Sequence, residues 1–181
     1  WLPNRHLNRE QMKNISFKND ILPLKNVLYR LALRIMLNRE EAEDIVQETL
    51  VKIWNKRDNW QNIDSLEAFS LTICRNIALD KKRKAGSDNA SIEESLIDSA
   101  DTASNPYDRM LQKDRLQMVK RIVNGLPEKQ RSCMQLRDFE GKSYKEIARI
   151  LTLSEEQVKV NIFRARQTVK QKYQELDKYG L

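Results

Sequence analysis

Hydrophobic residues recur at helical spacing along most of the chain, with charged and polar residues between them. The pattern is clearest over residues 136–171, where a short polar break separates two apolar stripes. The stripes consist of Ile147, Ala148, Ile150 and Leu151, and of Val158, Ile162, Ala165 and Val169. Positions three and four apart share one side of a helix, so each stripe predicts an amphipathic helix.

Both of these helices have a start signal. Ser143 stands three residues before Glu146, and Ser154 stands three residues before Gln157. At this spacing the two side chains of each pair satisfy free N–H groups in the first turn of a helix. The few residues between the helices leave room only for a sharp reversal. The stretch is therefore predicted to be a helix-turn-helix.

The second helix carries a basic face opposite its apolar stripe, at about 100° per residue. The outward residues are Lys159, Val160, Phe163, Arg164 and Gln167, with Arg166 and Lys170 able to reach phosphates. Such a face suits the major groove, because Arg bridges the two acceptors of guanine and apolar side chains contact thymine methyls. The alternative is the solvated face of an ordinary amphipathic helix. The outward aromatic ring of Phe163 counts against this alternative.

Three more helices are predicted in the first half of the chain. They span residues 21–37, 39–57 and 66–84, and a loop rich in Asn, Asp and Ser occupies residues 58–65. The outer face of the second helix carries Asp44, Gln47, Glu48 and Val51. A mixed acidic and apolar face often binds a protein partner, although Asp44 and Glu48 are alternatively solvated charges. A divalent metal held by these two carboxylates would lack further ligands.

The loop and the third helix contain a candidate nucleotide pocket. Trp60 stands in the loop, and Asn76 and Asp80 fall on the predicted inner side of the helix. A buried Asn must be hydrogen-bonded, which indicates either an internal clamp or, with Trp60, a pocket for an unpaired base. The helix ends in Lys81, Lys82, Arg83 and Lys84. Cations suit a helix C terminus and also attract a DNA backbone.

The second half begins after a change of composition. Residues 86–108 contain six acidic residues and no Lys or Arg, which is typical of a flexible linker. Further helices are predicted from about residue 109 to Gly125, which is expected to form a left-handed cap, from Leu126 to Phe139, and to about residue 176. The predicted fold is all-α. It consists of helical bundles at 21–85 and 109–176, an acidic linker at 86–108 and a disordered extension at 1–20.

Charge and residue usage narrow the function. The 33 Lys and Arg outnumber the 26 Asp and Glu, and the net charge of +7 favours nucleic acid as a partner. No membrane-length apolar run and no secretion signal are found, so a cytoplasmic protein is expected. Cys74 and Cys133 are predicted to be free core thiols, with a disulfide or redox sensor as the alternative. The single histidine, His6, leaves a zinc site or catalytic triad without partners. No metal, cofactor or catalytic residue is therefore expected.

Three stretches in this order resemble bacterial RNA polymerase sigma factors of the extracytoplasmic function (ECF) group. AEDIVQETLVKIW, at residues 42–54, resembles the region 2 helix that grips a coiled coil of the polymerase. FSLTICRNIALDKKRK, at residues 69–84, resembles the helix that melts and binds the -10 promoter element. LPEKQRSCMQLRDFEGKSYKEIARIL with QVKVNIFRAR, within residues 126–166, is similar to region 4, whose second helix reads the -35 element.

The resemblance implies a non-catalytic promoter-specificity subunit whose partners are core RNA polymerase, promoter DNA and an anti-sigma factor. Its implied contacts are Asp44, Gln47 and Glu48 for polymerase, Trp60, Asn76, Lys82 and Arg83 for the -10 element, and Lys159, Val160, Phe163, Arg164, Arg166 and Gln167 for the -35 element. The chain departs from the family at Ser70, where many members have Trp, and at Val160 and Asn161, which replace a small hydroxyl residue and an Arg. The alternative function is that of an ordinary dimeric helix-turn-helix regulator on spaced half-sites.

Overall fold

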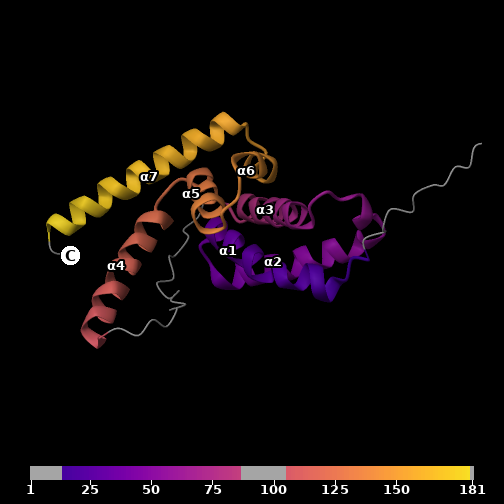
Figure 1. Cartoon of the computed structure of the whole chain (residues 1–181), viewed down its shortest axis with the longest axis horizontal. Coiled ribbons are helices and arrows are strands. Elements are labelled where there is room, and N and C mark those ends of the chain that lie inside the picture. Colours follow the sequence, from indigo (N-terminus) through magenta and orange to yellow (C-terminus); the bar gives the residue numbers. More distant parts are fainter. Residues whose placement is uncertain (1–13, 87–104, 180–181) are drawn as a thin grey trace, which may run out of the picture.

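The computed structural model describes residues 14–86 and 105–179 of the chain, and every regular element in those ranges is a helix (Figure 1). The first range contains η1 (Phe17–Ile21), η2 (Leu22–Leu24), α1 (Lys25–Met36), α2 (Arg39–Asn55), η3 (Arg57–Asn62) and α3 (Leu66–Lys84). The second contains α4 (Pro106–Asn124), α5 (Glu128–Met134), η4 (Gln135–Phe139), α6 (Tyr144–Leu151) and α7 (Glu155–Lys178). The all-α prediction is confirmed. Most of the predicted linker, residues 87–104, lies outside the described residues.

Side-chain caps determine where several helices begin. The Asn38 side chain accepts a hydrogen bond from the backbone N–H of Glu41 at 3.0 Å, at the start of α2. Both predicted capping boxes are present at the starts of α6 and α7, where each Ser and its partner three residues later exchange hydrogen bonds. Local sequence alone therefore determines the helix-turn-helix boundaries.

The helix ends differ from the prediction. Gly125, expected to be left-handed, has φ −78° and ends α4 in a right-handed conformation. The left-handed caps are instead Leu37, with φ 58°, and Thr152, with φ 54°. Gly141 also has a positive φ, 67°, between η4 and α6. At Leu37 and Thr152 the tight reversal into the next helix overrides the usual preference for glycine.

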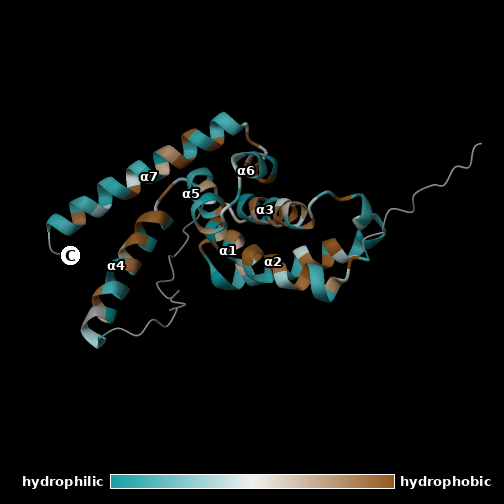
Figure 2. Cartoon of the chain, viewed as in Figure 1, coloured by the Kyte–Doolittle hydropathy of each residue, from teal (hydrophilic) through white to brown (hydrophobic). Residues whose placement is uncertain are grey.

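One hydrophobic core cluster joins the two predicted helical bundles and includes buried residues from both halves of the described chain. α1 packs against α5 and η4, and α3 packs against α6. The core includes Leu28, Leu31 and Ile35 of α1, Leu71 and Ile77 of α3, Cys133 of α5, Leu136 of η4, and Ile147 and Ile150 of α6. A smaller cluster of Val123, Leu126, Met134 and Ala165 joins α4, α5 and α7. Figure 2 shows hydrophobic and hydrophilic stretches alternating along the helices.

Arg131 links the ends of α1 and α4 beneath this core. Its side chain is buried, and its Nε donates to the carbonyl of Arg34 at 2.8 Å while Nη2 donates to that of Ile35 at 3.4 Å. Nη1 donates to the carbonyls of Asn124, at 3.3 Å, and Leu126. Burial lowers the pKa of Arg131. One guanidinium thus satisfies helix-end carbonyls from both halves.

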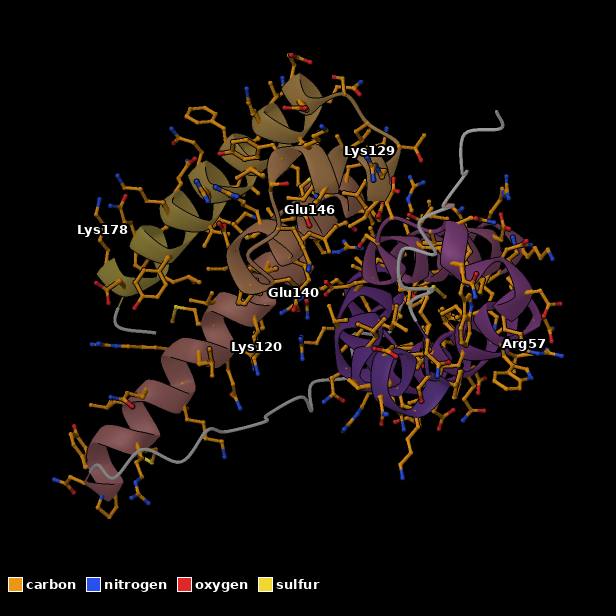
Figure 3. All side chains as sticks on the ribbon, turned by 45° about the vertical axis from the view of Figure 1, so that its right-hand side comes forward. Arg57, Lys120, Lys129, Glu140, Glu146 and Lys178 are labelled. Carbon is orange, nitrogen blue, oxygen red and sulfur yellow. The ribbon has the colours of Figure 1, made fainter. Side chains whose placement is uncertain are left out.

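Glu140 forms a second polar link between the halves (Figure 3). Its carboxylate accepts hydrogen bonds from Nε and Nη2 of Arg30 at 2.6 and 2.8 Å, and from the amide of Gln135 at 2.9 Å. Burial alone would raise the pKa of Glu140, but the bonds from Arg30 and Gln135 outweigh it and hold that pKa below its usual value. Lys142 adds a bond to Glu67 of α3 at 2.6 Å.

The N-terminal segment joins the fold earlier than predicted. Residues 1–13 lie outside the described residues, but 14–20, expected to belong to a disordered extension, are structured. Ile15 and Phe17 pack against a cluster of Ile21, Ile53 and Trp60. Two apolar residues in a polar stretch give too weak a periodic signal to reveal this packing.

Both cysteines are free and buried, as predicted. The Cys74 thiol donates to the carbonyl of Leu28 at 3.4 Å. Burial raises the pKa of Cys74 and of Cys133 to about 12, so both stay protonated and unreactive near neutral pH. Within the described ranges no helix is both long and apolar enough to cross a lipid bilayer.

Candidate nucleic-acid and protein interfaces

The outward face of α7 is exposed as predicted. Val158, Ile162 and Ala165 are buried against α5 and α6. On the other side Phe163 is 63% exposed and Val160 43% exposed. Lys159, Arg164 and Gln167 are exposed beside them. An aromatic ring this open contributes little to the packing of the fold and is accessible to a partner.

The cations on this face differ in their surroundings. Lys159 Nζ lies 5.7 Å from the centre of the Tyr144 ring at the start of α6, and Arg137 Cζ lies 4.5 Å from the same ring. Arg164 is exposed, and its side chain forms no hydrogen bond or ion pair with any residue of the described ranges. Its guanidinium is therefore free to meet a base edge.

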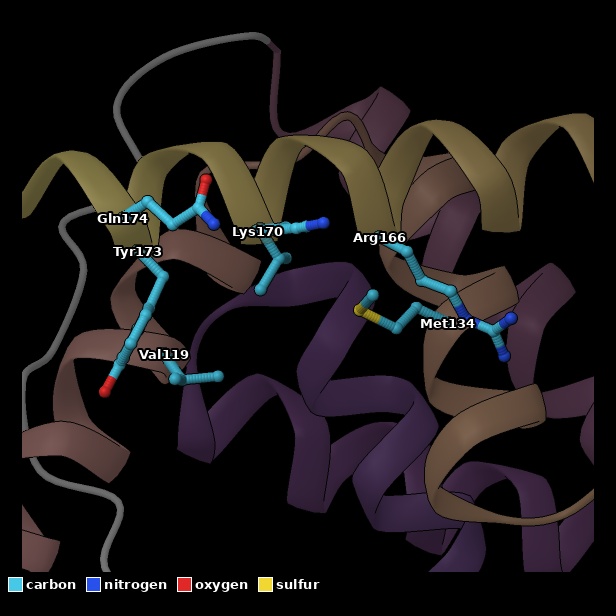
Figure 4. Close-up of a pocket in the computed structure, with 7 residues that line it drawn as sticks. Val119, Met134, Arg166, Lys170, Tyr173 and Gln174 are labelled. Carbon is cyan, nitrogen blue, oxygen red and sulfur yellow. The ribbon is translucent and has the colours of Figure 1, made fainter.

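Arg166 does not belong with this group in the structure. Its Nε donates to Oδ2 of Asp138 at 3.1 Å and its Nη2 to Oδ1, and these bonds raise the pKa of Arg166. Figure 4 shows its side chain leaving α7 toward Met134, at one end of a groove of about 550 Å³. The groove is lined also by Val119, Val169, Lys170, Tyr173 and Gln174. The structure thus turns Arg166 away from the outward face.

The predicted protein-binding face of α2 is accessible. Asp44 and Gln47 are exposed, and Val51 is 58% exposed beside them. Glu48 is half-buried, with its carboxylate 3.2 Å from Lys52 Nζ and 3.6 Å from Lys81 Nζ of α3. The face therefore combines carboxylates, an amide and an apolar anchor. Within the described ranges no three His, Cys, Asp or Glu residues gather to hold a metal ion.

Trp60 is a core residue, which corrects the prediction that it lines a base pocket. It is 5% exposed, and its Nε1 donates to the carbonyl of Ile53 at 3.0 Å. Its ring stacks on Phe17 at a centroid distance of 6.5 Å and meets Trp54 edge-on at 6.2 Å. The stacking faces and the polar edge of Trp60 are thus already occupied.

The inner side of α3 also differs from the prediction. Asn76 and Asp80, placed there by the apolar spacing, are exposed, and Asp80 pairs with Arg83. The buried residues are Ala68, Ser70, Leu71, Cys74, Ile77 and Ala78. α3 packs on α1 and α2 on one side and on α6 on the other, so small residues line its interior. Ser70, one of the predicted departures from the family pattern, is buried and donates to the carbonyl of Leu66.

The four predicted -10 residues are therefore not gathered at one pocket. Trp60 is in the core, and Asn76 is open to solvent with only a 3.5 Å contact from Arg75. Lys82 Nζ donates to the carbonyl of Ile35 at the end of α1, at 3.2 Å, and burial lowers its pKa. The exposed surface of α3 near Asn76 and Arg83 is what remains accessible.

Sequence reasoning missed the polar residues that join the two halves. Arg131 and Arg34 are 97 residues apart, and Glu140 and Arg30 are 110 residues apart. From the neighbouring sequence alone, each of these four residues is indistinguishable from an ordinary charged residue on the surface of a helix. Asp138 was missed too, because it lies 28 residues before Arg166 in the sequence and only the fold brings its carboxylate beside that guanidinium.

Comparison with known proteins defines the class. The family described as Sigma-70 region 2 matches residues 21–87, and Sigma-70, region 4 matches residues 116–169. The chain is 31% identical over 144 residues to the ECF RNA polymerase sigma-E factor of Escherichia coli K12, with 75% of each chain covered. It is 26% identical over 167 residues to the RNA polymerase sigma-H factor of Pseudomonas aeruginosa, covering 87% of this chain and 86% of that one.

Two solved structures have the same fold as this chain. The sigma factor RpoE of Bartonella quintana, solved in complex with the anti-sigma factor NepR, superposes with a TM-score of 0.67 at 28% identity, covering 87% of this chain and 96% of that one. CnrH, in complex with the cytosolic domain of CnrY, shares the fold with a TM-score of 0.58 at 21% identity, over 85% of this chain and 84% of that one. These matches define a sigma-70 type factor of transcription initiation. The chain belongs to its ECF group, and it is a promoter-specific initiation factor and not an enzyme.

Proposed function

We propose that the chain binds core RNA polymerase through α2, reads the -35 duplex with α7 and holds the opened -10 strand with α3. The observation that carries this proposal is the outward face of α7, where the 63% exposed Phe163 stands beside the unpaired Arg164. No packing need accounts for either residue. A major groove accounts for both, since it offers thymine methyls to Phe163 and guanine acceptors to Arg164.

The -35 contacts are divided by chemistry. Val160 and Phe163 supply apolar contacts, Arg164 and Gln167 reach base edges, and Lys159 at the edge of the face meets a phosphate. The capping box of Ser154 and Gln157 holds the start of α7 in place, so these side chains enter the groove in a defined register.

The -10 contacts are proposed on the exposed side of α3. Asn76 can hydrogen-bond the edge of an unpaired base, and Arg83 and Lys82 can meet the backbone of the opened strand. Extruding a base costs a few kcal/mol, which these contacts and those of the polymerase offset. Trp60 supports the loop from within the core in this proposal.

Asp44, Gln47 and Glu48 are proposed to contact polymerase, with Val51 as the apolar anchor beside them. The face is exposed and combines an apolar centre with polar groups, the usual composition of a protein interface. The work of the chain would accordingly be done in the cytoplasm, where polymerase and promoter DNA meet.

An anti-sigma factor is proposed as a further partner. The RpoE structure, 28% identical to this chain, is a complex with the anti-sigma factor NepR. An inhibitor of this chain would act by covering the faces that polymerase needs, the α2 face first.

Reconstitution with bacterial core polymerase on a promoter library tests this function, and specific initiation is expected. The double reversal Asp44→Lys and Glu48→Lys should lower initiation at least about tenfold, because like charges across an interface cost several kcal/mol. The matched control reverses the exposed Asp114 and Asp177, outside α2, by the same total charge. Normal initiation by the α2 variant would contradict the assignment of this face, provided that its circular dichroism and Tm match those of wild type. Full duplex selectivity by the chain without polymerase would favour an ordinary regulator.

Arg164→Ala is expected to change the preferred -35 sequence while core binding stays intact. Losing one bidentate base contact should weaken discrimination at that base pair by about 1–3 kcal/mol. Promoter-library sequencing measures the preference, and fluorescence anisotropy measures the affinity for core polymerase. The control is Lys172→Ala, which changes a cation on the same helix outside the outward face of α7. A loss of affinity for core polymerase on replacing Arg164 would show that this part of α7 binds protein.

A further inference from the structure

The ion pair between Asp138 and Arg166 joins η4 to α7. Two parallel hydrogen bonds connect the carboxylate to the Nε and Nη2 edge of the guanidinium. The Arg166 side chain is 52% exposed and the Asp138 side chain 28% exposed. A planar fork of this kind matches a carboxylate and a phosphate equally well, so Asp138 occupies the edge with which Arg166 would grip a DNA backbone.

Arg166 also lies at the margin of the outward face of α7. At about 100° per residue it is roughly 60° round α7 from Phe163 and roughly 40° from the buried Ile162. Its side chain accordingly reaches down toward α5, as Figure 4 shows. The contact with Asp138 holds it there.

The residues around Asp138 in sequence are anchored to the rest of the fold. Arg137 Nη1 donates to the carbonyl of Lys142 at 2.8 Å and stacks on Tyr144, and Glu140 is bound by Arg30 of α1. The backbone on both sides of Asp138 is therefore anchored, which keeps its carboxylate close to Arg166. Moving Arg166 to a phosphate would leave Asp138 unpaired beside a second negative charge.

We propose that Asp138 is a specificity-determining positioning residue, which withholds Arg166 from the DNA backbone. The inference rests on the proposed function of α7. Phosphate contacts add affinity for any sequence, whereas base contacts separate one sequence from another. Withholding one cation lowers the affinity for non-promoter DNA and keeps the readout dependent on Val160, Phe163 and Arg164.

The test uses the full chain assembled with core polymerase, titrated with a duplex carrying a selected -35 element and with one in which that element is scrambled. Asp138→Asn should strengthen binding of the scrambled duplex and steepen the log–log salt dependence by about 0.9, the value for one phosphate. Between 50 and 200 mM salt the affinity should then fall about 3.5-fold more than in wild type. Discrimination between the two duplexes should decrease.

Two further variants isolate Arg166. Arg166→Gln alone should leave the salt dependence of wild type unchanged, because the withheld cation contributes nothing to it. The double variant Asp138→Asn with Arg166→Gln should return to wild-type behaviour. Glu175→Gln, which removes one exposed negative charge elsewhere on α7, should not steepen the dependence and controls for net charge.

Other results would overturn the inference. A flatter salt dependence for Arg166→Gln would mean that Arg166 already grips a phosphate in the wild-type complex. A lower Tm for Asp138→Asn with unchanged DNA binding would make the pair purely structural. Failure of the underlying function would be visible separately, as a wild-type assembly that does not distinguish the two duplexes at all.

Discussion

Replacing Arg131 with alanine is expected to lower the free energy of unfolding by about 3–5 kcal/mol. The buried guanidinium donates to four backbone carbonyls, those of Arg34, Ile35, Asn124 and Leu126. Its removal takes this donor from carbonyls at the ends of two helices, of which that of Ile35 keeps a bond from Lys82, and opens a cavity between the halves. Urea denaturation followed by circular dichroism measures the loss. Arg131→Lys should recover only part of it, since an ammonium cannot reproduce the planar fork.

The reactivity of Cys133 gives an independent readout of the same change. This thiol lies in the core shared by the two halves, on the same helix as Arg131. Labelling by a thiol reagent should therefore become faster when Arg131 is lost. Arg149→Ala removes an exposed cation from α6 and should change stability by no more than about 0.5 kcal/mol. Equal stability of the two alanine variants would show that Arg131 does not join the halves.

Trp60→Ala is expected to destabilise the fold by about 3–5 kcal/mol, as for other buried aromatic side chains. It would remove the centre of the cluster that holds Phe17, Ile21 and Ile53 at the end of α2. Trp60→Phe keeps most of that packing and loses the hydrogen bond to the Ile53 carbonyl, a loss of about 1 kcal/mol. Thermal and urea unfolding measure both effects.

Trp54→Ala is the matched comparison. Because Trp54 is 46% exposed, this substitution should lower the free energy of unfolding much less than Trp60→Ala does. Promoter opening measured on a pre-melted template separates the two roles that Trp60 can have. A stable Trp60→Ala protein that fails to hold the open -10 strand would restore Trp60 to the base pocket. A destabilised protein that still holds the strand at low temperature would agree with the burial seen here.

The sequence predicted the local features of the fold because their determinants lie within a few residues of each other. Ser143 and Ser154 each have a capping partner three positions later, and both capping boxes form. The apolar stripe led by Val158 and Ile162 is buried, and the face with Phe163 is open, since 3.6-residue periodicity separates the two sides of an isolated helix.

The features that depend on distant residues were beyond such reasoning. α3 contacts α1, α2 and α6, so three neighbouring helices decide which of its residues are buried, and Asn76 is left exposed. Trp60 is buried by Phe17, 43 positions earlier and outside the predicted domain. Among the candidate DNA contacts, Arg166 was misplaced for the same reason, because Asp138 competes for it from another helix.

The continuous core has a consequence for the way the protein melts. Cys133, Leu136, Ile147 and Ile150 belong to the same hydrophobic cluster as buried residues of α1 and α3, so the interiors of the two family regions are continuous. The two regions should consequently unfold as a single cooperative unit, with one calorimetric transition in place of two. A fragment that contained only one of the two regions would expose the apolar residues that the other region covers in the whole chain. Its stability and its tendency to aggregate would then reflect this exposed apolar surface as well as its native contacts.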